Sequence, residues 1–327
     1  MNQGCTLKME NLIIHSNMPK LSIIIPFSTT GPGVQLPKDW PETDRAYVIF
    51  NTIEVIKNIN SKLNIDKEII LVDNTNTFPD IKMPNLRIVK GLQYKSKAII
   101  KKWAKDRGLV IDNFTNQTMW ASIAYNIGIE NANSKYIVLQ HNDFFYQSSM
   151  INLLIGRLDR DKLGYISCDS KKISLSGYLY NREEVEQIVG EVEISHEQGG
   201  YIKTKELGFA DCYFFLAKKS FFKDYYVDWA WGDSNHGATI KCIKNKQGYI
   251  HMGPFYDNPN FESNTTERIY NFEGKVFGTH LKGGFSEHKY SCRIPNYVKV
   301  GEKLKTVHSP HTPSVNTFMK KLTDSNV

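Results

Sequence analysis

Residues 116–146 read NQTMWASIAYNIGIENANSKYIVLQHNDFFY, and this stretch decides the fold class. Its first half predicts an amphipathic helix, because apolar side chains recur at helical spacing at Trp120, Ile123, Ala124 and Ile127. Residues 136–139 form a continuous apolar run, which is typical of a short strand covered on both faces. His141, Asn142 and Asp143 follow that strand directly. Because ligands bind at the carboxyl edge of open α/β sheets, the stretch predicts a binding site there.

Further helix and strand patterns flank this stretch on both sides. Upstream, we expect strands over 21–27, 68–73 and 86–89 and an amphipathic helix over 43–63. Downstream, we expect helices over 148–158 and 233–247, strands over 164–168, 208–217 and 249–252, a hairpin arm over 173–180 and a polar surface insertion over 182–205. Alternating strands and helices predict an α/β fold with a doubly wound, mostly parallel, Rossmann-like sheet.

The composition is that of a soluble globular protein, with 327 residues of which 41% are apolar and 23% charged. The 41 Lys and Arg exceed the 34 Asp and Glu, and the net charge of +7 favours anionic partners such as nucleotide phosphates, acidic glycans or a membrane surface. No apolar run approaches the ~20 residues that span a bilayer, and residues 1–20 lack a secretory pattern. The five cysteines have no CxxC spacing, which is typical of thiols in a reducing compartment. We therefore expect a cytoplasmic protein that can associate with the inner face of the membrane.

Three aspartates occupy positions that suit chemistry. Asp73 and Asp143 end expected strands, and Asp233 begins an expected helix. Carboxylates at the end of strands suit a hard divalent cation or the hydroxyls of a ribose. The helix dipole favours the ionised form of a carboxylate at a helix start, so Asp233 can cap the helix or act as a base. Each aspartate taken alone can also be an ordinary cap or turn residue.

Four segments together resemble the inverting, GT-A-fold glycosyltransferases of the large family 2. The segments are residues 22–27 (SIIIPF), 68–74 (EIILVDN), 124–143 (AYNIGIENANSKYIVLQHND) and the pair 231–233 (WGD) and 240–249 (IKCIKNKQGY). The resemblance covers residues 20–255 and implies one glycosyltransferase domain there. Within it, residues 20–143 would bind the nucleotide-sugar and 144–255 would face the acceptor, while 1–19 form a lead-in and 256–327 a C-terminal extension with a basic tail.

The resemblance also implies roles for individual residues. Donor binding would involve Pro26, Phe27, Asp73, Asn74, Asn126, His141, Asn142, Asp143 and Lys282. Pro26 and Phe27 would lie beside the nucleotide base, and Asp73 would hydrogen-bond the base or the ribose. Asp233 would be the general base that takes the proton from the acceptor hydroxyl. Lys282 would meet a phosphate.

Residues 141–143 occupy the position of the family's Asp-x-Asp signature, with His141 in place of the first aspartate. Asp143 would then be the main ligand of a Mn²⁺ or Mg²⁺ ion, and His141 would either ligate Mn²⁺ or hydrogen-bond the donor. The loss of one carboxylate lowers the negative charge of the site, so its dependence on metal is open. His280, in the glycine-flanked segment 278–284, is either a third metal ligand on a flexible loop or an ordinary loop histidine.

The expected activity is transfer of a sugar from a nucleotide-diphosphate donor, most simply a UDP-sugar, to a hydroxyl of a glycan or lipid-linked glycan, with inversion. A nucleotidyltransferase is one alternative, although the loop after the first strand, STTGPGV at 28–34, lacks the basic residues that such an enzyme needs. A catalytically silent, glycan-binding subunit of GT-A type is another alternative, because His141 replaces an aspartate. A nucleic-acid partner is not expected, since aromatic residues do not interleave with the basic ones.

Overall fold

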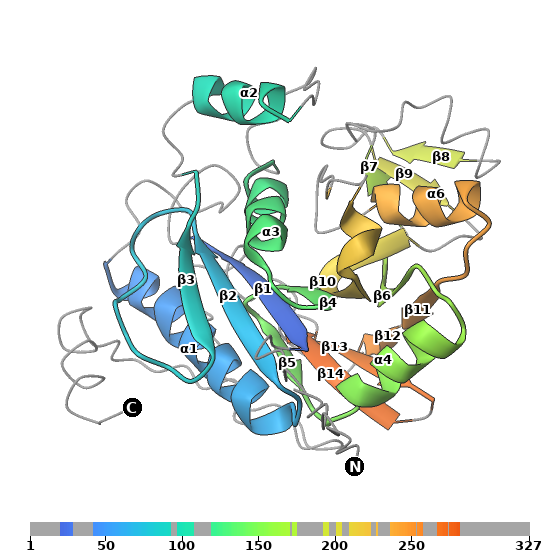
Figure 1. The fold of residues 1–327 in the computed structure, drawn as a ribbon, viewed down its shortest axis with the longest axis horizontal. Coiled ribbons are helices and arrows are strands. Elements are labelled where there is room, and N and C mark those ends of the chain that lie inside the picture. Colours follow the sequence, from blue (N-terminus) through green and yellow to red (C-terminus); the bar gives the residue numbers. More distant parts are fainter. Residues whose placement is uncertain are drawn as a thin grey trace, which may run out of the picture.

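A seven-stranded mixed sheet forms the centre of the protein (Figure 1). The computed structural model describes residues 20–28, 42–92, 97–107, 119–170, 172–174, 192–195, 201–204, 209–223, 227, 236–252, 254–257, 267–273 and 275–281. In spatial order the strands are β11 (Ile250–Met252), β6 (Tyr165–Ser170), β10 (Phe209–Lys218), β4 (Tyr136–Gln140), β1 (Leu21–Phe27), β2 (Lys67–Asp73) and β3 (Leu86–Lys90). All neighbours pair in parallel except β10, which is antiparallel to both β4 and β6. The expected α/β fold with a mostly parallel, Rossmann-like sheet is therefore confirmed.

Side chains that alternate along the strands divide the apolar core between the two faces of the sheet. Ile23 and Ile25 of β1 pack on the side of α1 (Glu42–Lys62) and α4 (Ile151–Arg160). Ile24 packs on the other side, which is covered by α3 (Met119–Asn131), α6 (His236–Lys244), the 3₁₀ helix η1 (Lys219–Phe222) and the Trp103 side chain of α2 (Lys97–Lys105). Gly128 brings α3 close to the sheet, because a Cβ there would lie 2.2 Å from the Ile24 side chain. Burial on both faces explains why the strands are apolar throughout.

Two smaller antiparallel sheets complete the described structure. One contains β12 (Pro254–Asp257), β13 (Glu267–Phe272), β14 (Lys275–Leu281) and β5 (Phe144–Tyr146), in that order. The other contains β7 (Lys172–Ser174), β9 (Tyr201–Thr204) and β8 (Val192–Ser195). In the first of these sheets β5, which directly follows residues 141–143, pairs with β14, a strand far along the chain. This pairing positions the candidate site.

The predicted elements of the central sheet are confirmed, with small shifts at their ends. The helix expected over 43–63 spans Glu42–Lys62, so Thr43 lies inside the helix rather than at its cap. The helix expected from residue 148 begins at Ile151, because residues 147–150 are used in the turn after β5. The polar insertion at 182–205 contains β8 and β9, which pair with each other. None of the helices among the described residues is long and apolar enough to cross a membrane.

The segment after Pro254 carries strands that the sequence pattern did not reveal. β13 pairs with both β12 and β14, and β14 also pairs with β5. The described part of the expected C-terminal extension is therefore joined by strand pairing to the residue that follows Asp143. The domain boundary at residue 255 stays a prediction.

Candidate functional site

Three predicted metal ligands lie together at the end of β4. This strand ends at Gln140, and residues 141–143 form the turn that leads into β5. β5 pairs antiparallel with β14, and their register sets Phe144 opposite His280. The close approach requires Gly278, because a Cβ there would lie 2.4 Å from the Phe144 ring. His280 thus lies on a strand, which corrects the expectation of a flexible, glycine-flanked loop.

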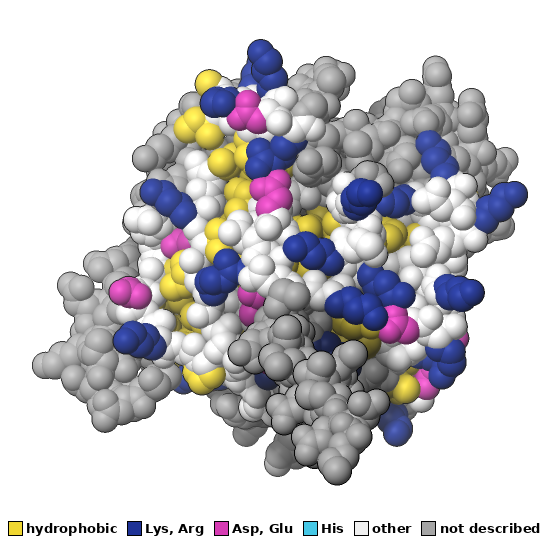
Figure 2. Space-filling view, viewed as in Figure 1, with side chains coloured by type: hydrophobic (Ala, Val, Ile, Leu, Met, Phe, Trp, Pro, Cys, Tyr) yellow, Lys and Arg dark blue, Asp and Glu magenta, His cyan; other side chains and the backbone are white. Residues whose placement is uncertain are grey.

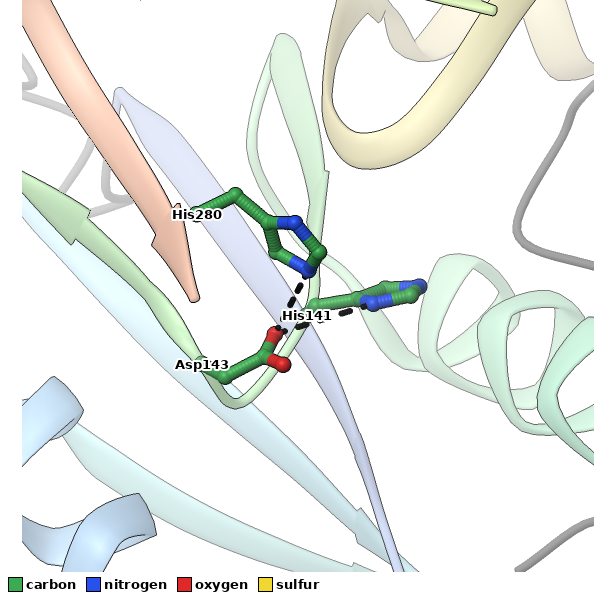
Figure 3. Close-up of side chains that lie close together, drawn as sticks. All are labelled: His141, Asp143 and His280. Atoms are coloured by element: carbon green, nitrogen blue, oxygen red, sulfur yellow. Dashed lines mark ion pairs between the residues drawn. The ribbon is translucent and has the colours of Figure 1, made fainter. Parts of the chain in front are cut away.

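His141, Asp143 and His280 point toward one another (Figure 3). Asp143 Oδ1 lies 3.1 Å from His280 Nε2 and 3.7 Å from His141 Nδ1. The potential ligand atoms of the three residues all lie within 4.8 Å of one another. One carboxylate and two imidazoles therefore face the same small space, although their residues come from two distant parts of the chain.

Two of these side chains carry buried atoms that have no hydrogen-bond partner among the described residues. Asp143 is 7% exposed and His280 is 2% exposed. Within the part of the chain that the structure describes, Asp143 Oδ1 and both ring nitrogens of His280 have no hydrogen-bond partner, so the short Asp143–His280 approach is an ion-pair contact. Buried polar atoms are normally satisfied, and those that are not mark places where a ligand or an ion can bind.

Charge around the site favours the ionised form of Asp143. Burial alone would raise the pKa of this carboxyl, but the positive charges of His280 and His141 outweigh burial and hold its pKa below the usual value. Asp143 is therefore an anionic oxygen donor, and a metal ion that bound here would displace the protons of the two imidazoles. The site thus offers one anionic oxygen and two imidazoles, a donor set that fits a divalent metal ion.

Tyr213 of β10 contacts both histidines. Its ring stacks on His280 with centroids 3.6 Å apart and meets the edge of the His141 ring at 4.9 Å. Its carbonyl oxygen also accepts a hydrogen bond from the backbone N–H of His141. One aromatic residue therefore restricts both imidazoles. Sequence reasoning missed Tyr213, because its place opposite His141 follows from the register of β10 against β4.

Two side chains of helix α1 form hydrogen bonds with the turn at residues 141–143 and with β5. Thr52 accepts a hydrogen bond from the Asn142 amide at 3.3 Å. Asn58 makes a two-point pairing with Tyr146: its amide donates to the Tyr146 carbonyl, and its own carbonyl accepts from the Tyr146 N–H. Asp143 lies between these two anchors, which fix the backbone on both sides of it. The Asn142 side chain therefore has a structural contact with Thr52, and its role in donor binding stays a prediction.

Asp73 ends β2 as predicted, but its carboxylate is engaged by its own turn. Oδ1 accepts hydrogen bonds from the N–H and hydroxyl of Thr75 and from the N–H of Asn76, and Oδ2 accepts one from the N–H of Phe78. These bonds make Asp73 a turn-forming residue. Oδ2 keeps capacity for a second hydrogen bond, so contact with a base or ribose stays a prediction.

Three further predicted donor residues lie next to Asp73. Phe27 is buried and packs edge-on against Phe78, with ring centroids 4.9 Å apart. Pro26 is partly buried beside it, opposite Val72 in the strand register. Asn74 is buried, and its backbone N–H donates to the Phe27 carbonyl. β1 and β2 thus bring these residues together at one end of the sheet.

Asn126 of α3 uses its side chain to hold another segment. Its amide donates to the carbonyls of Ser122 and Val227, and its own carbonyl oxygen accepts from the Val227 N–H at 2.9 Å. This two-point pairing anchors residue 227, six positions before Asp233 along the sequence. Asp233 and Lys282 lie outside the described residues. Their predicted roles, and that of Asn126 in donor binding, stay predictions.

The comparison with protein families places the site in a known context. The family model of Glycosyl transferase family 2 matches residues 91–226. The match includes α3, β4, His141, Asp143 and Tyr213, and it ends before Asp233 and His280. No curated protein sequence matches the chain.

Among solved structures, similar ones include "S. aureus TarS 1-349 in complex with UDP-GlcNAc" and the "Bifunctional IspDF from Campylobacter jejuni". The first is 11% identical, covers 79% of this chain and 57% of its own, and has a TM-score of 0.38. The second is 10% identical, covers 74% of this chain and 52% of its own, and has a TM-score of 0.40. The chain thus spans little more than half the length of either.

The family resemblance expected from the sequence is confirmed over the central part of the chain. The matched segment contains the strand end, the turn and two of the three side chains that converge in the site. Residues 91–226 thus match the model of Glycosyl transferase family 2, which is the family that the sequence resembles.

Proposed function

We propose that the protein transfers a sugar from a nucleotide-diphosphate donor to an acceptor hydroxyl of a glycan or lipid-linked glycan, with inversion at the anomeric carbon. The observation that supports this most is the convergence of His141, Asp143 and His280 at the end of β4, inside and next to the segment that matches the family. We propose a UDP-sugar as the first donor class to test, since a nucleotide-sugar is the donor that the family implies.

The same three residues would hold a divalent ion. The fit rests on the buried atoms of Asp143 and His280 that lack a hydrogen-bond partner within the described part of the chain, and on a donor set that metals accept. When bound, the ion would act as a Lewis acid on the departing diphosphate. Asp143 contributes the negative charge, Tyr213 restricts both imidazoles, and Thr52 and Asn58 fix the backbone around the turn.

Deprotonation of the acceptor is the second task, and we assign it to Asp233. Asp233 precedes α6 by three positions in the sequence, since that helix begins at His236 rather than at residue 233, and a positioned general base typically contributes ~10²–10⁴-fold to the rate. A base that activates the acceptor on the face opposite the leaving group gives inversion in a single displacement. The anchoring of Val227 by Asn126 supports this assignment, because it fixes one end of the segment that leads to Asp233.

The surface charge suits both substrates. Figure 2 shows Lys and Arg side chains spread over the face in view. Together with the net charge of +7, they favour the approach of an anionic nucleotide-sugar or an anionic acceptor. Steering of this kind depends on ionic strength, so substrate association should weaken as salt is raised.

The decisive experiment measures hydrolysis and transfer with a panel of nucleotide-sugars, with and without Mn²⁺. We expect at least one donor to be turned over, and we expect Asp233→Asn to keep donor affinity while turnover falls about 10²–10⁴-fold. Asp228→Asn, five residues earlier in the same segment, is the matched control. Retained turnover in the Asp233 variant would assign the base to another residue.

A catalytically silent glycan-binding subunit is the alternative that the molecule keeps open. It is favoured by the histidine at position 141 and by the engagement of Asp73 in its own turn. Absence of both turnover and nucleotide binding across the panel would select this alternative and reject the enzyme.

A further inference from the structure

We propose that Gln140 is a positioning residue for the candidate site. Its side-chain amide closes the turn at residues 141–143 and thereby sets the direction in which His141 and Asp143 face His280. Gln140 is the last residue of β4 and directly precedes the turn. The inference deepens the proposed function and rests on it, because the expected effect on turnover presupposes a transferase.

The side chain of Gln140 spans the turn. Its Nε2 donates to the carbonyl oxygen of Phe144 at 3.0 Å, the usual distance for a hydrogen bond from nitrogen to oxygen. The backbone N–H of Phe144 donates to the carbonyl of His141 across the same turn at 3.4 Å, which is long for such a bond. Of these two bonds, the one from the side chain has the better geometry and contributes more to closing the turn.

This bond joins the backbone segments that carry all three residues of the site. Gln140 precedes His141, and Phe144 follows Asp143. Phe144 also lies opposite His280 in the register of β5 and β14. A shift of the Phe144 carbonyl would therefore move both the backbone of Asp143 and the strand that pairs with β14. One amide group thus governs the spacing between the three side chains.

A glutamine is an unusual residue for these surroundings. Gln140 is 0% exposed, and it follows the apolar run at residues 136–139. Strand alternation places its side chain on the same face of the sheet as Val138, and Phe214 of β10 lies opposite it. Its Oε1 has no hydrogen-bond partner among the described residues. A buried amide that is only partly satisfied costs stability, and such residues are expected where function requires them.

Two roles of this amide predict different results for the variant Gln140→Met. Methionine is unbranched and adaptable like glutamine in length, and it forms no comparable hydrogen bond. If Gln140 only stabilised the fold, the variant would lose stability, and turnover would follow stability. If Gln140 positions the site, turnover falls while stability stays the same or rises, because the variant also removes a buried oxygen without a partner.

The test compares Gln140→Met with wild type in the full chain. We expect kcat for transfer to fall about tenfold, with the KM for the donor within about threefold of wild type. The urea midpoint should equal or exceed that of wild type. Amide hydrogen exchange at residues 141–146, followed by mass spectrometry, should become about tenfold faster, because the bond that closes the turn is lost. Exchange in β2 should stay unchanged.

Val138→Ala is the matched control. Val138 is fully buried two positions earlier in β4 and belongs to the core on the same face of the sheet. Its truncation leaves a cavity but removes no hydrogen-bonding group. We expect the urea midpoint to fall while kcat stays within about twofold of wild type. The two variants together separate loss of stability from loss of positioning.

Three results would overturn the inference: unchanged exchange in the turn of Gln140→Met, faster exchange with normal kcat, or an equal loss of kcat in Val138→Ala. If the wild-type chain turns over and any of these results is found, the transferase function stands and the role of Gln140 falls. If the wild-type chain turns over no donor, the proposed function falls, and exchange at residues 141–146 then decides alone whether Gln140 holds the turn.

Discussion

Asp143 and Asp159 lie near opposite ends of β4, and the two carboxylates differ in what they contact. Asp159 of α4 forms ion pairs with Lys218 at 2.7 Å and with Lys135 at 3.6 Å, and it accepts a short hydrogen bond from the hydroxyl of Tyr136. These partners, led by Lys218, lower its pKa to about 2. Asp143 is buried, and among the described residues its ion-pair contacts are with the imidazoles of His141 and His280. Asp159 is thus paired with lysines, which stay charged, whereas Asp143 faces imidazoles, which can give up their protons to a metal ion.

Other polar groups of the protein are satisfied by hydrogen bonds within the fold. Asn126 satisfies its amide with the backbone of residues 122 and 227. His251 lies at the end of a buried chain in which the Ala210 N–H donates to Thr239 and the Tyr165 hydroxyl bridges Thr239 and His251 Nε2. Satisfied groups of this kind should govern stability, whereas the cluster of His141, Asp143 and His280 should govern activity.

The largest effect is expected for Asp143→Asn. Loss of the anionic ligand should lower transfer about a hundredfold or more, because Lewis-acid stabilisation is worth several kcal/mol. The free energy of unfolding should change by less than about 1 kcal/mol, since the variant also removes a buried charge. Steady-state kinetics and urea unfolding test both statements. A large loss of stability with normal turnover would place Asp143 among the structural carboxylates.

Asn126→Leu should act in the opposite way. The exchange leaves the N–H and the carbonyl of Val227 without their partner, so the free energy of unfolding should fall by about 2–4 kcal/mol. The KM for the donor, measured well below the melting temperature, should stay within about twofold of wild type if the residue is structural. A large rise in donor KM with unchanged stability would instead support the donor-binding role predicted from the sequence.

His251 should make stability depend on pH. Burial lowers its pKa to about 4, from a value of 6.5 in the unfolded chain. As pH falls from 6.5 toward 4 the unfolded state takes up a proton that the folded state does not, so stability is complete above pH 6.5 and declines below it. The decline should be on the order of 2–3 kcal/mol. Urea unfolding across this range should show a shallower decline for His251→Gln, and an identical decline would exclude His251 as the cause.

The smallest effect is expected for Asp159→Asn, the counterpart of the first variant. Asp159 is partly exposed, so loss of its ion pairs should cost only about 1 kcal/mol of unfolding free energy. Metal binding and turnover should be unchanged, because Asp159 lies beyond the other end of β4 from the site. Reduced metal affinity in this variant would show that the two ends of the strand are coupled.

The sequence predicted the central sheet from its local pattern, and the family resemblance indicated the three side chains that converge, His141, Asp143 and His280. Apolar runs revealed β1, β2 and β4, and their polar ends revealed Asp73 and Asp143. The contacts that fix the site were not predictable in this way. Asn58 and Asn126 bind backbone groups 88 and 101 positions away, and such pairings leave no periodic signal.

The location of His280 shows how a local signal can mislead. Glycine beside a histidine suggested a flexible loop, whereas Gly278 serves close packing of β14 against Phe144. Whether a glycine marks mobility or a tight contact depends on what lies across from it, and that neighbour is 134 positions earlier in the chain (278 − 144).

Because β5 pairs with β14, the cluster of His141, Asp143 and His280 can be completed only late in the synthesis of the chain. During synthesis, Asp143 emerges from the ribosome long before His280, so a growing chain cannot offer the complete set of donors. An ion that binds only the finished arrangement would tie the two segments together and stabilise them by mass action. Occupancy of the site would then report that the C-terminal hairpin has docked, and a chain truncated before residue 275 would lack that signal.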